Sequence, residues 1–176
     1  MESEKNEVIS IRVDSNLKEK LASECKNEHT SMNAVINRAL LEYVGWNRHV
    51  KQGGWVTIFR SAFRSIIDLV EEKEIIRIGH EVGRDEYRAS SKLFFGTVDV
   101  DSLTQMIIDY FDHMNVNYQH TTNEGKNRFI VKHDLGKNWV LYFISTVESL
   151  FGEIGYMIKK EVACELCFDF EIIKVN

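Results

Sequence analysis

The chain has 176 residues, of which 44% are hydrophobic and 28% charged, and its formal net charge is −5. This composition is typical of a folded protein, and hydrophobic runs such as 66–70 and 139–144 are too short to cross a bilayer. The acidic start, MESEKNE, does not resemble a secretory signal. We therefore expect a cytoplasmic protein with no membrane partner, and the negative charge excludes a broadly basic surface for nucleic acid.

A short strand is expected first, because residues 8–13 alternate in polarity. A strand of this kind is half-buried, with successive side chains on opposite faces. One face would carry Ile9, Ile11 and Val13, and the other Val8, Ser10 and Arg12.

Two helices follow the strand in the prediction. Asp14 is suited to cap the first helix, along which Leu17, Leu21 and Cys25 recur every four residues, with its end near residues 27–29. Thr30 and Ser31 offer a second cap before an apolar stripe of helical spacing. That stripe consists of Val35, Ile36, Ala39, Leu40, Tyr43 and Val44.

One strand and two helices are too few to close a core, and a lone strand leaves both edges unpaired. A twofold homodimer, in which two such strands pair antiparallel above four helices, solves both problems. The outward face of the paired strands would then be free for a ligand.

The remaining residues predict a second domain of the α+β class. The polar stretch 48–54 suggests a linker between a domain over 1–47 and a domain over 55–176. Expected helices span 55–72, 101–114 and 137–151, and expected strands span 74–80, 116–122, 128–134 and 165–175, with a turn at 123–125. This order, β-α-β-β-α-β, is that of a ferredoxin-like fold.

The segments ISIRVDSNLKEKL (9–21) and TSMNAVINRALLEYV (30–44) resemble the ribbon-helix-helix family of DNA-binding proteins. This family includes the Arc, MetJ and CopG repressors and the nickel regulator NikR. The resemblance covers about a quarter of the chain and implies a β-α-α fold, a homodimer and double-stranded DNA as partner.

The resemblance also implies two sets of DNA-contacting residues. In the family the outward residues of the paired strands read base edges in the major groove, which assigns this role to Val8, Ser10 and Arg12. An arginine can donate two hydrogen bonds to guanine, and a serine hydroxyl can donate or accept. The start of the second helix, with Ser31, Met32 and Asn33, is expected to hold a phosphate, because helix N-termini favour anions.

The local charge limits how such a module could bind. Residues 1–50 contain seven basic and eight acidic residues, a net charge of −1. Affinity would therefore have to come from base contacts and dimerisation rather than from non-specific attraction to phosphates.

The second domain offers weaker candidates. Cys164 and Cys167 form a CxxC pair, but in a regular strand their thiols would point apart, so we expect reduced, structural cysteines. His120 and His133 would face the same side of a hairpin closed around Gly125, as metal ligands or as ordinary interior histidines. No cofactor is implied, and no nucleophile elbow, P-loop, dinucleotide fingerprint or HExxH motif supports an enzyme.

The expected function is a dimeric, sequence-specific transcriptional regulator, either a repressor or an activator. Its second domain would sense a small-molecule or metal effector, or form higher oligomers. Two alternatives stay open. One is the antitoxin of a toxin-antitoxin pair, and the other is a metal- or small-molecule-binding protein that uses the ribbon only to dimerise.

Overall fold

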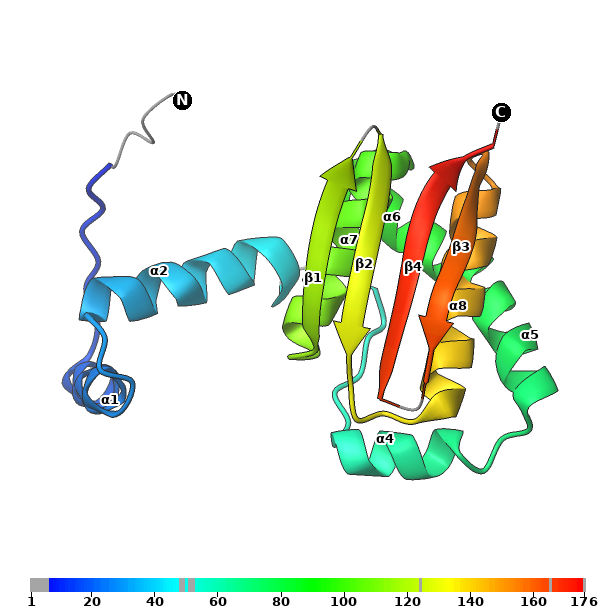
Figure 1. The fold of residues 1–176 in the computed structure, drawn as a ribbon. Coiled ribbons are helices and arrows are strands. Elements are labelled where there is room, and N and C mark those ends of the chain that lie inside the picture. Colours follow the sequence, from blue (N-terminus) through cyan, green and yellow to red (C-terminus); the bar gives the residue numbers. More distant parts are fainter. Residues whose placement is uncertain (1–6, 48–49, 51–52, 124, 165, 176) are drawn as a thin grey trace. The chain divides into compact units, whose positions relative to one another are not determined.

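The computed structural model describes residues 7–47, 50, 53–123, 125–164 and 166–175. The chain divides into two units, residues 1–45 and 46–176, which are described separately (Figure 1). None of the helices in these described ranges is long and apolar enough to cross a membrane.

The first unit contains helices α1 (Ser15–Asn27) and α2 (Met32–Glu42), and both start where the sequence predicts. The Asp14 carboxylate accepts a hydrogen bond from the Leu17 amide at 2.9 Å, and the Ser31 hydroxyl accepts one from the Ala34 amide at 3.2 Å. Each cap satisfies one amide that the first helical turn leaves without a partner. A π-helical turn, η1 (Tyr43–Asn47), follows α2 and includes Gly45.

Residues 8–13 carry no strand in the single chain. A strand exists only with a hydrogen-bonded neighbour, and the first unit of one chain offers none among its described residues. The β element of the predicted β-α-α unit is therefore not formed in one chain, and its pairing in a dimer stays a prediction.

The second unit is a two-layer α+β structure around one antiparallel sheet, whose strand order is β1-β2-β4-β3. The strands are β1 (Asn117–Asn123), β2 (Lys126–Lys132), β3 (Tyr156–Ala163) and β4 (Cys167–Lys174). Helices α6 (Arg88–Phe95), α7 (Val100–His113) and α8 (Lys137–Gly152) lie behind one face of the sheet in Figure 1. The remaining helices are α4 (Arg60–Ile67) and α5 (Glu72–Val82).

The core lies between the sheet and α7 and α8. Alternation on β2 and β4 turns their larger apolar residues toward the helices, so that the rings of Phe129 and Phe170 stack at 5.1 Å. The ring of Phe111 in α7 packs against the ring of Phe143 in α8, with 5.0 Å between their centroids. Such burial of aromatic rings is the main source of stability in a unit of this size.

The predicted ferredoxin-like order is wrong in two places. Residues 74–80, predicted as the first strand, belong to helix α5, and strand β3, which pairs with β4, was not predicted. The strand predicted over 165–175 is β4. In α5, Arg77 bonds Glu74 and Glu81, one helical turn to either side, while Ile75 and Gly79 are buried against the unit. The isoleucines that suggested a strand thus sit on an amphipathic helix.

The other predicted elements are confirmed with shifted ends. The helix expected over 101–114 is α7, the strands expected over 116–122 and 128–134 are β1 and β2, and the helix expected over 137–151 is α8. The turn between β1 and β2 contains Gly125, with φ +76°, whereas Glu124 lies outside the described residues. The helix expected over 55–72 is reduced to α4, and Phe59 just before it is 85% exposed.

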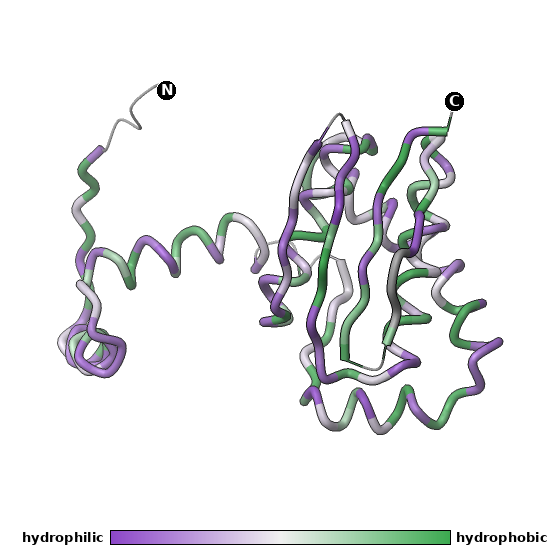
Figure 2. Tube along the Cα trace, in the orientation of Figure 1, coloured by the Kyte–Doolittle hydropathy of each residue, from purple (hydrophilic) through white to green (hydrophobic). Residues whose placement is uncertain are grey.

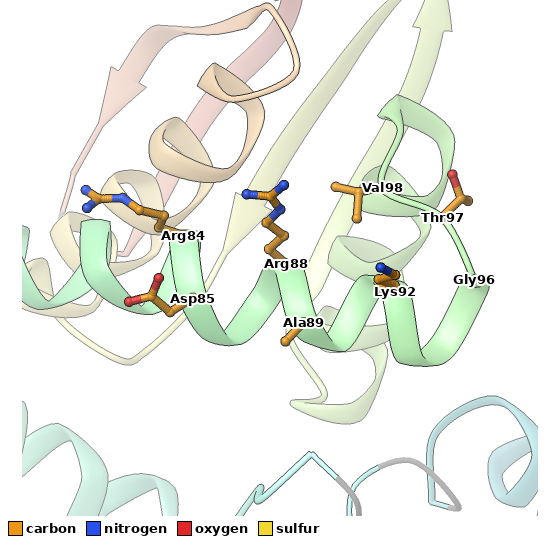
Figure 3. A pocket seen from close by; sticks show the side chains of 8 residues that line it. All are labelled: Arg84, Asp85, Arg88, Ala89, Lys92, Gly96, Thr97 and Val98. Carbon is orange, nitrogen blue, oxygen red and sulfur yellow. The ribbon is translucent and has the colours of Figure 1, made fainter.

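Helix α5 continues through a π-helical turn, η2 (Gly83–Tyr87), into α6. Gly79 of α5 and Gly83 of η2 lie against α8. A Cβ on Gly79 would lie 2.7 Å from the Tyr142 carbonyl oxygen, and one on Gly83 would meet the backbone of Thr146. Only glycine permits this approach. The other side of η2 and α6 borders a hollow of about 520 Å³ (Figure 3).

The predicted linker, 48–54, falls partly outside the described residues, which omit 48, 49, 51 and 52. Around it, Trp46 is buried and Val50 and Trp55 pack against the core of the second unit. The Trp46 ring stacks on His113 at 4.7 Å and meets Trp55 edge to face at 5.1 Å. The chain is therefore anchored to the second unit immediately after Gly45.

Candidate nucleic-acid interface

The segment predicted to read DNA is exposed in the single chain. Ser10 and Arg12 are exposed and Val8 is 97% exposed, as a base-reading set requires. The opposite set is also uncovered, with Ile9 at 77%, Ile11 at 54% and Val13 at 41%. An isolated chain thus leaves four β-branched apolar side chains in water, Val8 included.

The two helices also leave most of their hydrophobic side chains exposed. Val35 is the one buried hydrophobic residue among the described residues of the first unit, at 7% exposure. The hydrophobic residues that recur along this unit in Figure 2 are largely open to solvent. Those more than a third exposed in and after the helices are Leu17, Leu40, Leu41, Tyr43 and Val44. Exposed apolar surface on this scale marks an interaction site.

The predicted phosphate site coincides with the capped start of α2. Because the Ser31 hydroxyl already accepts from the Ala34 amide, the amides of Met32 and Asn33 remain as the first-turn donors without an intrahelical acceptor. The Ser31 hydroxyl keeps its own proton to donate. This arrangement can bind an anion, and the positive end of the helix dipole adds to the attraction.

The two arginines of this unit, Arg12 and Arg38, differ in their partners. Arg38 donates to Glu28 at 2.6 Å, and this hydrogen bond raises the pKa of the Arg38 guanidinium above its usual value. Arg12 makes no ion pair with any described residue. Among the described residues of this unit, Arg12 is thus the arginine without an ion-pair partner.

The two histidines considered as metal ligands lie apart. Both face the helix-covered side, but His120 pairs with Phe129, and His133 lies four residues beyond Phe129, about 13 Å along the strand direction. His120 Nε2 lies 2.9 Å from Asn127 Oδ1. Within the described residues no group of three His, Cys, Asp or Glu side chains could hold a metal ion.

His133 instead belongs to the core. Its ring contacts Trp139 and Phe168, its Nδ1 accepts from the Leu135 amide at 3.3 Å, and its Nε2 is buried without a partner among the described residues. Burial lowers the pKa of His133 to about 4, against a smaller opposing effect from Asp134. The ring is therefore neutral at physiological pH.

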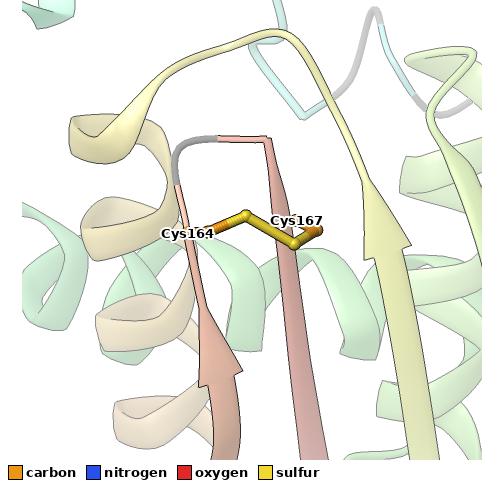
Figure 4. Close-up of a disulfide and its surroundings, with 2 residues drawn as sticks. All are labelled: Cys164 and Cys167. Carbon is orange, nitrogen blue, oxygen red and sulfur yellow. A yellow bond between two sulfur atoms is a disulfide. The ribbon is translucent and has the colours of Figure 1, made fainter.

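Cys164 and Cys167 form a disulfide, which corrects the prediction of reduced thiols (Figure 4). The prediction placed both residues in one strand, where two side chains three residues apart point to opposite faces. In the structure they flank the β3–β4 connection, with their Cα atoms 5.2 Å apart, and the Cys164 amide donates to the Cys167 carbonyl oxygen at 2.7 Å. Cys25 is a free cysteine.

Sequence reasoning did not single out the cations beside the hollow of Figure 3. Arg84, Arg88 and Lys92 are spaced by four residues, the spacing that places side chains on one helix face. The signal was present in the sequence, but it could be recognised only once residues 83–95 were known to be helical.

Comparison with known protein families gives one match. Residues 7–45 match the model of the ribbon-helix-helix proteins of the copG family. No curated protein and no solved structure matches the chain. The predicted resemblance of the N-terminal segment is therefore confirmed, and it points to a DNA-binding protein with a regulatory or antitoxin-like role.

Proposed function

We propose that the protein is a dimeric, sequence-specific transcriptional regulator. The observation that carries this proposal is that the match to a ribbon-helix-helix family falls on a segment whose apolar residues are uncovered in one chain. Proteins of this family bind DNA and dimerise. Antiparallel pairing of residues 8–13 from two chains would bury Ile9, Ile11 and Val13 over the helices.

In this dimer the outward residues are assigned as the DNA readers. Arg12 and Ser10 supply hydrogen bonds to base edges, and Val8 contacts at most a thymine methyl group. Ser31 with the amides of Met32 and Asn33 holds a backbone phosphate on each side, which sets the register but carries no sequence information. Such a protein would work in the cytoplasm, on double-stranded DNA.

Within the proposal, the unit over 46–176 senses an effector or joins dimers into a higher oligomer. It has its own sheet, core and buried aromatic residues. This self-contained core favours a regulator over an antitoxin whose C-terminal part folds around a toxin. A protein that uses its ribbon only to dimerise is the remaining alternative.

The proposal is tested with the full-length protein and a library of genomic DNA fragments. Selection should enrich fragments that share a short, approximately palindromic sequence, because a twofold dimer presents the same reading surface twice. Light scattering on the same sample should give at least a dimer. Enrichment of no sequence, from a protein that is dimeric, would leave the ribbon as a dimerisation device and refute the regulator.

A further inference from the structure

A row of cations lies along the exposed side of η2 and α6, in a protein that is acidic overall. Arg84, Arg88 and Lys92 line the hollow of about 520 Å³ together with Thr97 and Val98 of the connection to α7 (Figure 3). This volume is within the range of small-molecule sites, about 300–1,000 Å³. The lining includes one acidic residue, Asp85.

Two of the three cations of this row form no ion pair within the part of the chain that the structure describes. Arg88 pairs with Glu153 at 3.0 Å and is still 59% exposed. Arg84 and Lys92 are exposed, and neither forms an ion pair with any residue that the structure describes. Elsewhere in this unit arginines such as Arg60, Arg77 and Arg128 are matched to carboxylates.

The spacing of the row defines the size of a ligand. Residues four apart on a helix are about 6 Å apart along its axis, so the row from Arg84 to Lys92 is about 12 Å long. A ligand that met all three cations would need two or more negative charges separated by several ångströms. Guanidinium groups recognise phosphate and carboxylate oxygens through paired hydrogen bonds.

On the side of η2 and α6 that faces the core, aromatic residues contact Trp46 and Trp55, which lie just after the first unit. The ring centroids of Tyr87 in η2 and Trp55 are 5.4 Å apart, and those of Phe94 in α6 and Trp46 are 6.3 Å apart. Trp46 is the first residue after the N-terminal unit. A ligand that shifts η2 and α6 would therefore move the residues to which the DNA-binding segment is attached. The π-helical turn within this stretch fits such a role, because π turns occur often at functional sites.

We propose that this hollow binds a small polyanion, a molecule carrying phosphate or several carboxylate groups, through Arg84, Arg88 and Lys92. In the regulator proposed above, this molecule is the effector, and Trp46 and Trp55 transmit its binding. The inference rests on the proposed function for its regulatory meaning, but the binding itself can be measured without DNA.

The test is calorimetric titration of the full-length protein with inorganic pyrophosphate and with citrate, at constant ionic strength. We expect saturable binding of at least one probe at a 1:1 ratio per chain, with a change in tryptophan emission. The double variant Arg84→Ala/Lys92→Ala should weaken binding at least tenfold. The control Lys126→Ala/Lys174→Ala removes the same charge from exposed positions on β2 and β4 and should bind as the wild type does.

Three results would overturn the proposal. Absence of saturable binding for both probes would refute the site, and equal loss in the control variant would reduce it to non-specific attraction. If Arg84→Ala/Lys92→Ala weakened DNA binding in the absence of any polyanion, the row would be a DNA contact instead. If the protein bound pyrophosphate or citrate but no DNA, the proposed regulatory function would be refuted, whereas the proposed polyanion site would stand.

Discussion

Replacement of Gly83 by alanine should destabilise the second unit, although alanine is the better helix former. The gain in helix propensity from glycine to alanine is about 1 kcal/mol. Against it, the new Cβ would lie 3.0 Å and 3.1 Å from the carbonyl carbon and Cα of Thr146, and closer still to its carbonyl oxygen. These are backbone atoms in the middle of α8, so they cannot rotate away, and overpacking of this kind costs about 1–3 kcal/mol or more.

We expect Gly83→Ala to lower the free energy of unfolding by about 2 kcal/mol, at the upper end of the overpacking range less the propensity gain. Gly79→Ala should cost less, about 1 kcal/mol, because its shortest contact, 2.7 Å to the Tyr142 carbonyl oxygen, is longer than the shortest contact at Gly83. For a unit of 131 residues, a loss of 2 kcal/mol corresponds to a melting temperature lower by roughly 6–10 °C.

Thermal unfolding followed by circular dichroism measures this effect, with Gly152→Ala as the matched control. Gly152 is the last residue of α8, and a Cβ there would meet no atom within 4 Å. The control should melt at or slightly above the wild-type temperature. A Gly83→Ala variant as stable as the control would refute the close contact between η2 and α8.

Three further predictions concern the dimer, the buried histidine and the disulfide. Ile11→Glu should convert the dimer to a monomer in light scattering, whereas Arg12→Ala should leave the dimer intact, because Ile11 is assigned to the inner face of the ribbon. Since the pKa of His133 is lowered to about 4 in the folded state, its unfolded form takes up the proton first as the pH falls below 6.5, so stability should decrease between pH 6.5 and 4 by up to about 3 kcal/mol. Urea unfolding at several pH values measures this, and His133→Gln should flatten the dependence. Cys164→Ser/Cys167→Ser should cost no more than about 2 kcal/mol, because the disulfide closes a very short loop; a larger loss would show that the disulfide supports more than its own turn.

The helices of the first unit could be predicted because their signals are local. Asp14 and Ser31 cap the helices that directly follow them, and nothing distant is needed to fix those ends. The ribbon is different, because residues 8–13 form no strand in the single chain and their pairing with a second chain stays a prediction. The alternation predicts which residues would share a face, and one chain alone cannot test it.

The errors in the second unit arise where distant residues decide the structure. Residues 74–80 are helical because Gly79 lets α5 approach α8, more than sixty residues further along the chain. Strand β3 was missed because Lys159 and Lys160 interrupt its alternation and a register shift follows at Lys160. Without β3 the connection at 164–167 could not be recognised as a turn, and the disulfide was missed with it.

The cations of the candidate effector site were missed for a related reason. Arg84, Arg88 and Lys92 lie on one face only if residues 83–95 are helical, and the sequence left that stretch partly unassigned. The proposed DNA-reading residues could be assigned from the sequence, because the family resemblance and the alternation define their positions, and this assignment stays a prediction.

The most direct test of the central claim is the affinity of wild-type protein, Arg12→Ala and Lys20→Ala for DNA fragments selected from a genomic library. Lys20 is an exposed cation on α1 and serves as the charge-matched control. We predict that Arg12→Ala loses about 1–3 kcal/mol, or roughly 5- to 150-fold, on the selected sequence while remaining dimeric, and that Lys20→Ala changes little. Equal binding of wild type and Arg12→Ala on every sequence would contradict the assignment of residues 8–13 as a DNA-reading ribbon.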